Sequence, residues 1–280
     1  MQFIHWYPGH IAKAERKLKE QLNLVDVVVE VADARIPLSS MYPDVKRLIG
    51  EKPRLIIFNK TDAAEIEKTK KLVEKIKSET GCNILFTSNT DNKDITKIVN
   101  KIADLSQPAI TKLIKKGLLP RPARAMVIGM PNVGKSSIIN KLIKKTKTKT
   151  GAKAGVTRQQ QWVRINPRVD LLDTPGIIPV KQVEQEKALK LAFVDSIGEN
   201  AYDLESISAE FLKLMLNKYP LVIKSRYGID EQDEEITLET IAVKRNLLGQ
   251  NSRPDTLRAA SMLMNDFRDG RLGKLTLDDE

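Results

Sequence analysis

A glycine-rich segment between an apolar run and a helical pattern constrains the fold of this chain more than any other feature. Residues 129–136 read GMPNVGKS and match the pattern GxxxxGKS. Residues 125–128 before it are apolar and typical of a short strand, and residues 136–143 after it read as a helix. Such a strand-to-helix turn presents backbone N–H groups and a helix N-terminus to a phosphate. The segment therefore predicts an α/β domain with a phosphate-binding loop.

The residue types of this loop have distinct expected roles. Lys135 is expected to reach the β and γ phosphates of a nucleotide as a point charge, and the Ser136 hydroxyl to coordinate Mg²⁺. The neighbouring positions are predicted to line the phosphates, and they are Asn132, Val133, Gly134 and Ser137. The predicted ligand is a nucleotide with its magnesium ion.

A second strand pattern ends in a segment suited to the metal and the terminal phosphate. Residues 169–176 read VDLLDTPG. Asp173 is expected to hold the metal through water, and the Gly176 amide to contact the γ-phosphate. Thr157 lies between the two motifs and is the candidate for a second hydroxyl ligand of the metal.

A third motif predicts which base is bound. Residues 59–62, NKTD, follow the apolar strand pattern of residues 55–58. The Asp62 carboxylate can accept hydrogen bonds from N1–H and the exocyclic amine of guanine, an edge that adenine does not present. Lys60 can lie along the base plane. We therefore expect guanine nucleotides, and a metabolic P-loop kinase is disfavoured.

The loop after the next strand completes the expected base site. The apolar residues 84–86 are followed by Thr87 and Ser88, which fit the loop that closes over the base in GTPases. The guanine-binding prediction thus covers Asn59, Lys60, Asp62, Thr87 and Ser88. The guanine motif precedes the phosphate loop, which is the reverse of the order in ordinary GTPases, so the sequence predicts a circularly permuted one.

The alternation of strands and helices predicts the architecture of the first 180 residues. Six strand candidates are separated mostly by helical patterns, which favours a doubly wound, mainly parallel six-stranded P-loop GTPase sheet. Residues 166–168 read as a hairpin turn, so one edge strand is expected to be antiparallel. Residues 106–124 read as a short helix followed by an extended connector, at the place where permutation has rejoined the sheet.

The remaining residues, 181–280, are predicted to form a smaller all-helical C-terminal domain that binds RNA or the ribosome. Apolar stripes indicate helices around residues 207–215, 238–245 and 257–267. Five arginines of this region are candidates for contacts to RNA phosphates, namely Arg245, Arg253, Arg258, Arg268 and Arg271.

The distribution of charge predicts a polyanionic partner. The chain has a net charge of +11, and residues 105–169 contain fifteen Lys and Arg but no Asp or Glu. The surplus of positive charge therefore lies in one window, which favours RNA as the partner. A solvated lysine-rich face is the alternative for any single lysine.

Cysteine usage and hydropathy bear on the compartment. Cys82 is the only cysteine, so a disulfide within the chain is excluded and a reducing environment is expected. The sequence contains no stretch of about eighteen apolar residues, which favours a soluble protein with no membrane partner. We expect a monomer in the cytoplasm or in an organelle matrix.

Six segments in this unusual order form a family signature. They are residues 6–14 (WYPGHIAKA), residues 33–37 (DARIP), NKTD, GMPNVGKS, residues 155–162 (GVTRQQQW) and residues 173–177 (DTPGI). Together they resemble the YlqF/RbgA family of circularly permuted ribosome-assembly GTPases. The resemblance implies GTP hydrolysis to GDP, with Mg²⁺, coupled to maturation of the large ribosomal subunit and contact with its rRNA.

The resemblance also bears on how water is activated. In Ras-like enzymes a glutamine soon after the DxxG motif orients the attacking water, whereas Gly176 is followed here by Ile177. The resemblance implies that His10 takes this role once the ribosome orders its loop, although by itself His10 reads as a helix-start histidine. It further implies that Asn132 helps to hold K⁺ against the phosphates.

The function predicted from the sequence is a GTPase acting in late maturation of the large ribosomal subunit, whose turnover the ribosomal particle stimulates. The alternative is an RNA-binding assembly chaperone that uses the nucleotide only as a conformational latch.

Overall fold

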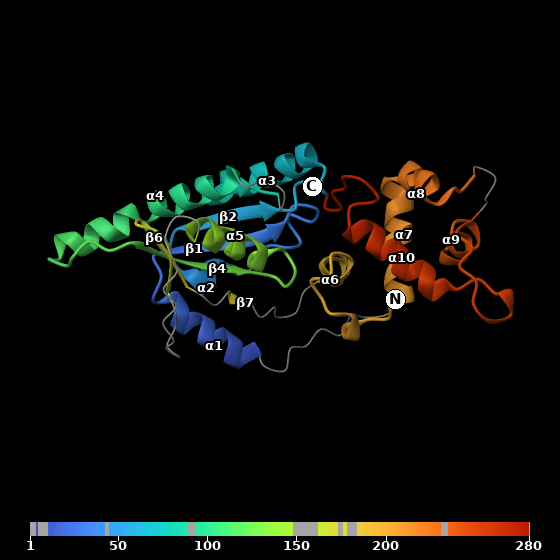
Figure 1. The fold of residues 1–280 in the computed structure, drawn as a ribbon, viewed down its shortest axis with the longest axis horizontal. Helices are drawn as coiled ribbons and strands as arrows, with labels where there is room; N and C mark the ends of the chain where they lie inside the picture. Colours follow the sequence, from blue (N-terminus) through green and yellow to red (C-terminus); the bar gives the residue numbers. More distant parts are fainter. Residues whose placement is uncertain are drawn as a thin grey trace. The chain divides into compact units, whose positions relative to one another are not determined.

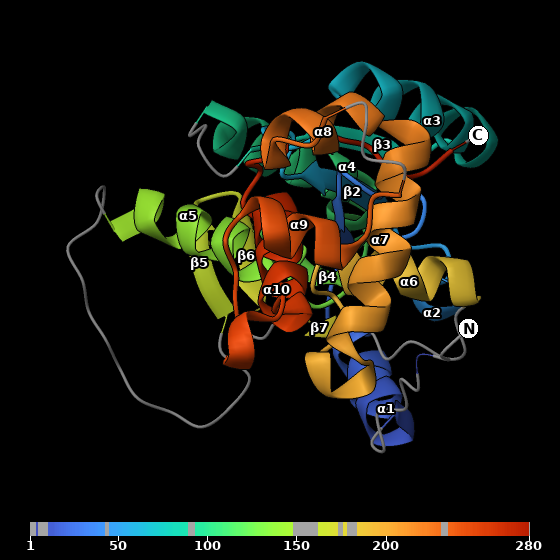
Figure 2. The ribbon, with the colours of Figure 1, turned by 90° about the vertical axis from the view of Figure 1, so that its right-hand side faces the viewer.

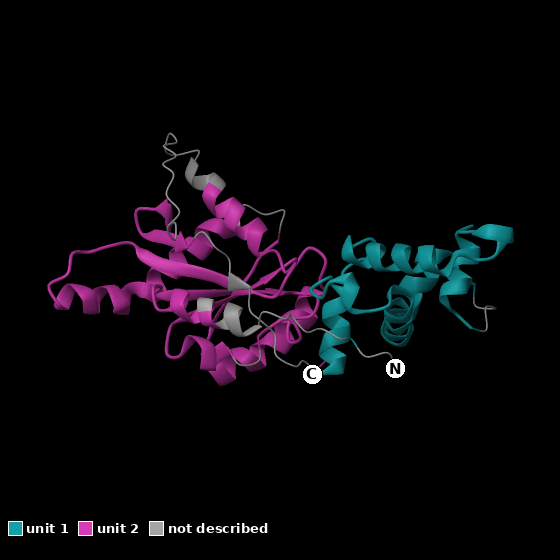
Figure 3. Cartoon of the chain, turned by 90° about the horizontal axis from the view of Figure 1, so that it is seen from below, with its two compact units in different colours: residues 1–7, 183–277 teal, residues 8–182, 278–280 magenta. Residues whose placement is uncertain are grey.

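The structure is a computed structural model that describes residues 4, 11–42, 45–88, 93–147, 162–172, 176–177, 184–230 and 235–279. The chain divides into two compact units, coloured separately in Figure 3. The sheet unit contains residues 8–182 and 278–280, and the helical unit contains residues 1–7 and 183–277.

A mainly parallel sheet forms the centre of the sheet unit, and all six predicted strands are present. Their order across the sheet is β3-β2-β1-β4-β6-β5, with only the β5–β6 pair antiparallel, as the predicted hairpin requires. The two-residue strand β7 pairs with β4 in addition. The strands are β1 Val27–Asp33, β2 Arg54–Asn59, β3 Asn83–Phe86, β4 Ala123–Gly129, β5 Trp162–Asn166, β6 Val169–Leu172 and β7 Gly176–Ile177.

Helices cover the sheet on both sides (Figures 1 and 2). They are α1 Ile11–Leu22, α2 Val45–Ile49, α3 Ile66–Thr80, α4 Lys93–Lys115 and α5 Lys135–Lys147. Leu18 and Leu22 of α1 pack in one apolar cluster with Val28 of β1 and Met126 of β4. Helices α4 and α5 both contact β4. Every residue of β1 is buried, as expected for a central parallel strand.

Helix α4 is longer than the sequence predicts. The expected short helix after residue 106 is the continuation of one 23-residue helix that contains Pro108. Proline removes one helical hydrogen bond, but burial of Ile98 and Ile102 keeps the helix against the sheet. The Ser106 hydroxyl donates to the carbonyls of Ile102 and Ala103 just before the proline. The expected extended connector then leads into β4.

Among its described residues, the helical unit contains the three helices predicted from apolar stripes and two more. Its α-helices are α6 Gln185–Phe193, α7 Leu204–Lys218, α8 Pro220–Tyr227, α9 Leu238–Lys244 and α10 Thr256–Arg268. Phe211 of α7 lies between Phe193 and Phe267, with ring centroids 5.1 and 4.8 Å away. The sequence gives no periodic signal for helix α8, because its aliphatic residues, 221–223, are consecutive. None of the helices in the described ranges is long and apolar enough to cross a membrane.

The chain passes from the helical unit back to the sheet unit at Asp278. The Asp278 side chain accepts hydrogen bonds from the backbone N–H groups of Leu38 (2.8 Å) and Ser39 (3.0 Å) and from the Ser39 hydroxyl (2.6 Å). Only 1% of Asp278 is exposed. A carboxylate with three such donors is firmly held.

Candidate nucleotide-binding site

The predicted nucleotide motifs meet at one edge of the sheet. Strands β1 to β4 are parallel, so their carboxyl ends lie on the same side. Asn59 ends β2, Thr87 directly follows β3, and the phosphate loop follows β4. Ligands of open α/β sheets bind outside the carboxyl ends of the strands, which is where these loops lie.

Two glycines of the phosphate loop occupy positions that exclude any side chain. Gly129 and Gly134 have φ values of +148° and +98°. A Cβ atom at Gly129 would lie 2.3 Å from the Val31 carbonyl oxygen, and one at Gly134 would lie 2.1 Å from Nδ2 of Asn59. The loop therefore fits tightly against β1 and against the NKTD segment, and its backbone remains accessible to a ligand.

Asn59 connects three of the predicted segments. Its Nδ2 donates to the Val133 carbonyl (3.0 Å) in the phosphate loop, and its Oδ1 accepts from the Thr87 hydroxyl (3.2 Å). Asn59 is fully buried, and Val133 lies 74 residues further along the chain. The amide thus fixes the base-side loops relative to the phosphate side.

Further contacts hold the loop after β3. The N–H and hydroxyl of Thr61 both donate to the Thr87 carbonyl, at 3.2 and 3.0 Å. Lys141 of α5 donates to the Ser88 carbonyl (3.2 Å), a contact that sequence reasoning missed. Asp62 lies in the same turn with an exposed side chain. Thr87 and Ser88 therefore lie next to both the NKTD turn and the helix that follows the phosphate loop.

Lys135 is the first residue of α5 and is only 7% exposed. Its ammonium group donates to the Met130 carbonyl within the phosphate loop. Burial lowers the pKa of Lys135 to about 8. An anion at the loop opposes this effect, because a nearby negative charge favours the ammonium form. Lys135 therefore fits a phosphate ligand.

Ser136 and Ser137 are exposed at the N-terminus of α5, where a hydroxyl and free N–H groups suit phosphate and magnesium. Mg²⁺ usually takes one or two protein oxygens and completes its shell with phosphate and water, so a single serine here is compatible with it. Gly176 pairs with Ile128 of β4, next to the start of the phosphate loop. Thr157, Asp173 and His10 lie outside the described residues, so their predicted roles are untested.

Asp33, at the end of β1, is the first residue of the DARIP segment, to which sequence reasoning assigned no role. In the structure it is the centre of a charged cluster. Its carboxylate accepts from Nε and Nη2 of Arg35, at 3.0 and 2.8 Å, and its Oδ2 lies 2.9 Å from the Lys60 ammonium. Burial alone raises the pKa of a carboxyl group, but the charges and hydrogen bonds of Arg35 and Lys60 outweigh it and lower the pKa of Asp33 to about 2. Asp33 is therefore ionised beside the guanine motif.

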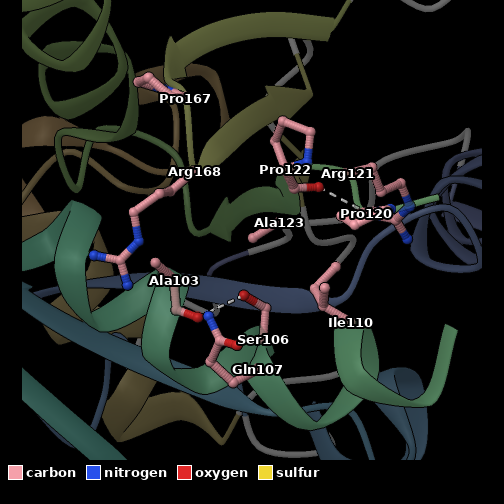
Figure 4. Close-up of a pocket in the computed structure, with 10 residues that line it drawn as sticks. All are labelled: Ala103, Ser106, Gln107, Ile110, Pro120, Arg121, Pro122, Ala123, Pro167 and Arg168. Carbon is pink, nitrogen blue, oxygen red and sulfur yellow. Dashed lines mark hydrogen bonds between the residues drawn. The ribbon is translucent and has the colours of Figure 1, made fainter. Parts of the chain in front are cut away.

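A separate cavity of about 240 Å³ lies at the opposite edge of the sheet (Figure 4). Its lining includes Ala123, the first residue of β4, whereas the phosphate loop follows the last residue of that strand. Arg121 and Arg168 also line it, and they pair with Asp26 and Asp104, respectively. This cavity is distinct from the nucleotide loops.

A glycine loop between a strand and a helix, joined through Asn59 to an NKTD turn that precedes it in the chain, defines a circularly permuted P-loop GTPase. A family model described as 50S ribosome-binding GTPase matches residues 124–246. Ribosome biogenesis GTPase A of Bacillus cereus is 37% identical over 277 residues, covering 98% of this chain and 93% of the relative. The chain belongs to this family, the YlqF/RbgA GTPases, which confirms the predicted resemblance.

More distant relatives and solved structures agree. Mitochondrial ribosome-associated GTPase 1 of Bos taurus is 33% identical over 302 residues, covering 98% of this chain and 88% of that protein. A GDP-bound structure of YlqF matches with a TM-score of 0.67 and 30% identity, over 94% of this chain and 98% of the other. A GNP-bound YlqF from T. maritima gives a TM-score of 0.65 at 30% identity, over 95% and 97% of the two chains.

Proposed function

We propose that this GTPase acts in late maturation of the large ribosomal subunit and that the ribosomal particle stimulates its turnover. Asn59 carries the GTP-binding part of the proposal, because it joins the guanine-type turn to the phosphate loop. The names of the relatives, ribosome biogenesis GTPase A and mitochondrial ribosome-associated GTPase 1, support the setting. We further propose that the protein is a monomer in the cytoplasm or in an organelle matrix.

Each part of the site has a proposed task in binding. Asp62 binds the guanine edge, Lys60 lies along the base, and Lys135 binds the β and γ phosphates. The backbone of the phosphate loop and the N-terminus of α5 complete the phosphate contacts. Ser136 and Thr157 would hold Mg²⁺ through their hydroxyls and Asp173 would hold it through water, and the bound ion would neutralise charge on the phosphates.

Hydrolysis requires a group that orients water. We assign this task to His10, whose imidazole can accept a proton near neutral pH, and we assign K⁺ coordination to Asn132. Asn132 lies in the turn of the phosphate loop with a left-handed backbone conformation, φ being 55°.

Contact with rRNA is proposed for selected basic residues rather than for the whole positive window. Arg121 and Arg164 pair with acidic residues, and Arg124 lies over the Trp162 ring, so these arginines are engaged inside the sheet unit. At the end of α4 the situation differs, because Lys112, Lys115 and Lys116 are exposed beside the exposed Leu118 and Leu119. These three lysines are the favoured RNA contacts of the sheet unit.

In the helical unit, the expected RNA contacts divide into one structural arginine and four exposed ones. Arg268 donates to the carbonyls of Ala192 and Phe193, so it connects α10 to α6 and is a structural residue. Arg245 lies over the Tyr227 ring and Arg271 pairs with Asp266 and Asp269, but both are exposed. These two and the exposed Arg253 and Arg258 are the proposed phosphate contacts.

GTP turnover measured with and without large-subunit particles tests the function. We expect particles to stimulate wild-type turnover, His10→Ala to bind GTP normally but lose most of this stimulation, and Lys135→Ala to lose nucleotide binding. Unchanged turnover with particles that nevertheless co-sediment with the protein would favour the chaperone alternative. Binding of ATP as tightly as GTP would reject the guanine assignment.

A further inference from the structure

The side chain of Lys60 has to be held if it is to lie beside a base. Lys60 has a left-handed backbone conformation, with φ of 63°, and its side chain is 19% exposed. A free lysine side chain has about 2 kcal/mol of rotamer entropy, which is lost when one geometry is fixed. An ammonium group fixed before the ligand arrives reduces that loss on binding.

The Asp33 carboxylate provides such a fixed point. Its Oδ1 accepts from the backbone N–H and Nε of Arg35, both at 3.0 Å, and its Oδ2 receives Nη2 of Arg35 and faces the Lys60 ammonium. The Asp33 backbone N–H donates to the Ser40 hydroxyl (2.9 Å). Asp33 is also directly opposite Asn59 in the β1–β2 register. The carboxylate therefore has one orientation, with Oδ2 directed at Lys60.

We propose that Asp33 is a positioning residue for guanine recognition, which holds the Lys60 ammonium so that the lysine stem lies beside the base bound by Asp62. The inference rests on the proposed roles of Lys60 and Asp62. Arg35 orients the carboxylate, and Lys60 carries its effect to the nucleotide. Asp33 itself acts only through Lys60.

The same strand provides a matched control. Glu30 is also fully buried, accepts from the Tyr42 N–H (2.8 Å) and from Nε of Arg54 (2.7 Å), and lies three residues before Asp33. Both carboxylates are buried and paired with an arginine, but Glu30 contacts Tyr42 and Arg54, whereas Asp33 contacts Lys60. Glu30→Gln therefore reports the general effect of disturbing a buried ion pair in β1.

The test is a double-mutant cycle on the affinity for fluorescently labelled GDP, with the full chain and Mg²⁺. Asp33→Asn is expected to weaken binding about tenfold, as loss of one charge-assisted contact predicts, and Lys60→Met to do the same. The double variant is expected to be no weaker than either single variant, because both remove one interaction. Glu30→Gln is expected to stay within about twofold of wild type.

Two results would overturn the inference. One is Asp33→Asn binding GDP as tightly as wild type, and the other is an undiminished effect of Asp33→Asn in the Lys60→Met background. If Asp33→Asn does not fold, Lys60→Met alone decides, because wild-type affinity in that variant would show that the held ammonium has no role. Failure of the proposed function is a different result, in which the wild type itself does not prefer GDP to ADP.

Discussion

Among the described residues, each unit contains a buried carboxylate that pairs with two cationic side chains. The two clusters differ in how far these cationic side chains are exposed to solvent. In the sheet unit, Asp33 binds Arg35 and Lys60, whose side chains are 2% and 19% exposed. In the helical unit, Asp266 accepts from Nε of Arg226 (2.8 Å) and Nη1 of Arg271 (3.0 Å), whose side chains are 35% and 54% exposed.

The comparison shows that the same pairing can serve two purposes. Around Asp33 the charges are enclosed, so the pairing fixes side chains beside the nucleotide loops. Around Asp266 the carboxylate is 1% exposed and also accepts from the Tyr227 hydroxyl, while the guanidinium groups of its two arginines extend to the surface. We propose that the enclosed cluster positions a ligand contact and that the open one presents cations to an anionic surface.

The largest expected effect separates stability from nucleotide binding. Asp266→Asn leaves Arg226 and Arg271 without their shared anion, and we expect it to destabilise the helical unit by about 3 kcal/mol. Urea denaturation monitored by circular dichroism measures this loss. GDP affinity is expected to stay at the wild-type value, and a drop like that of Asp33→Asn would break the comparison.

Acid denaturation is the next test. The pKa of Asp33 is lowered to about 2 from an ordinary value of 3.8, so its stabilising effect is present above pH 4 and is lost as the pH falls towards 2. The shift corresponds to about 2 kcal/mol. Stability measured between pH 4 and 2 is expected to fall less steeply in Asp33→Asn than in wild type, and parallel curves would contradict this.

Lys135 contrasts with both clusters, because burial alone sets its pKa near 8. A bound phosphate raises that pKa, so the nucleotide complex holds more protons, and GDP affinity must fall as the pH rises above 8. We expect GDP affinity to fall about tenfold between pH 7 and 9. Uptake of one proton on binding can change the affinity by at most tenfold per pH unit. Lys135→Arg, which stays charged, controls for titration of guanine itself, and an unchanged wild-type affinity would reject the shift.

The smallest expected effect concerns the open cluster. In a plot of log affinity for large-subunit particles against log salt concentration, Arg271→Met is expected to make the slope shallower by about 0.7 to 0.9. This is the amount for one lost phosphate contact. Sedimentation at several salt concentrations measures the slope. Arg16→Met, at an exposed residue of α1 that pairs with Glu20, is the control and is expected to leave the slope unchanged.

The sequence predicted the features that depend on local pattern. All six strands and the helix after the phosphate loop follow from apolar runs and glycine spacing, and the NKTD and GMPNVGKS segments indicated the same pocket. Local pattern does not specify long-range hydrogen bonds, so the contact of Asn59 with Val133 and that of Asp33 with Lys60 needed the fold. The sequence around Pro108 predicted a helix boundary that the structure does not have, because the proline removes one hydrogen bond from a 23-residue helix without ending it.

The anchoring of Asp278 makes residues 183–277 topologically an insertion in the sheet unit rather than a free appendage. Residues 182 and 278 both belong to the sheet unit, so the unfolded segment between them is a loop whose two ends are joined to that unit. The entropy of closing such a loop depends only logarithmically on its length. Doubling the number of residues in a flexible loop changes the closure free energy by about 0.6 kcal/mol. Helices can therefore be lengthened or added between residues 183 and 277 with little change in the free energy of loop closure.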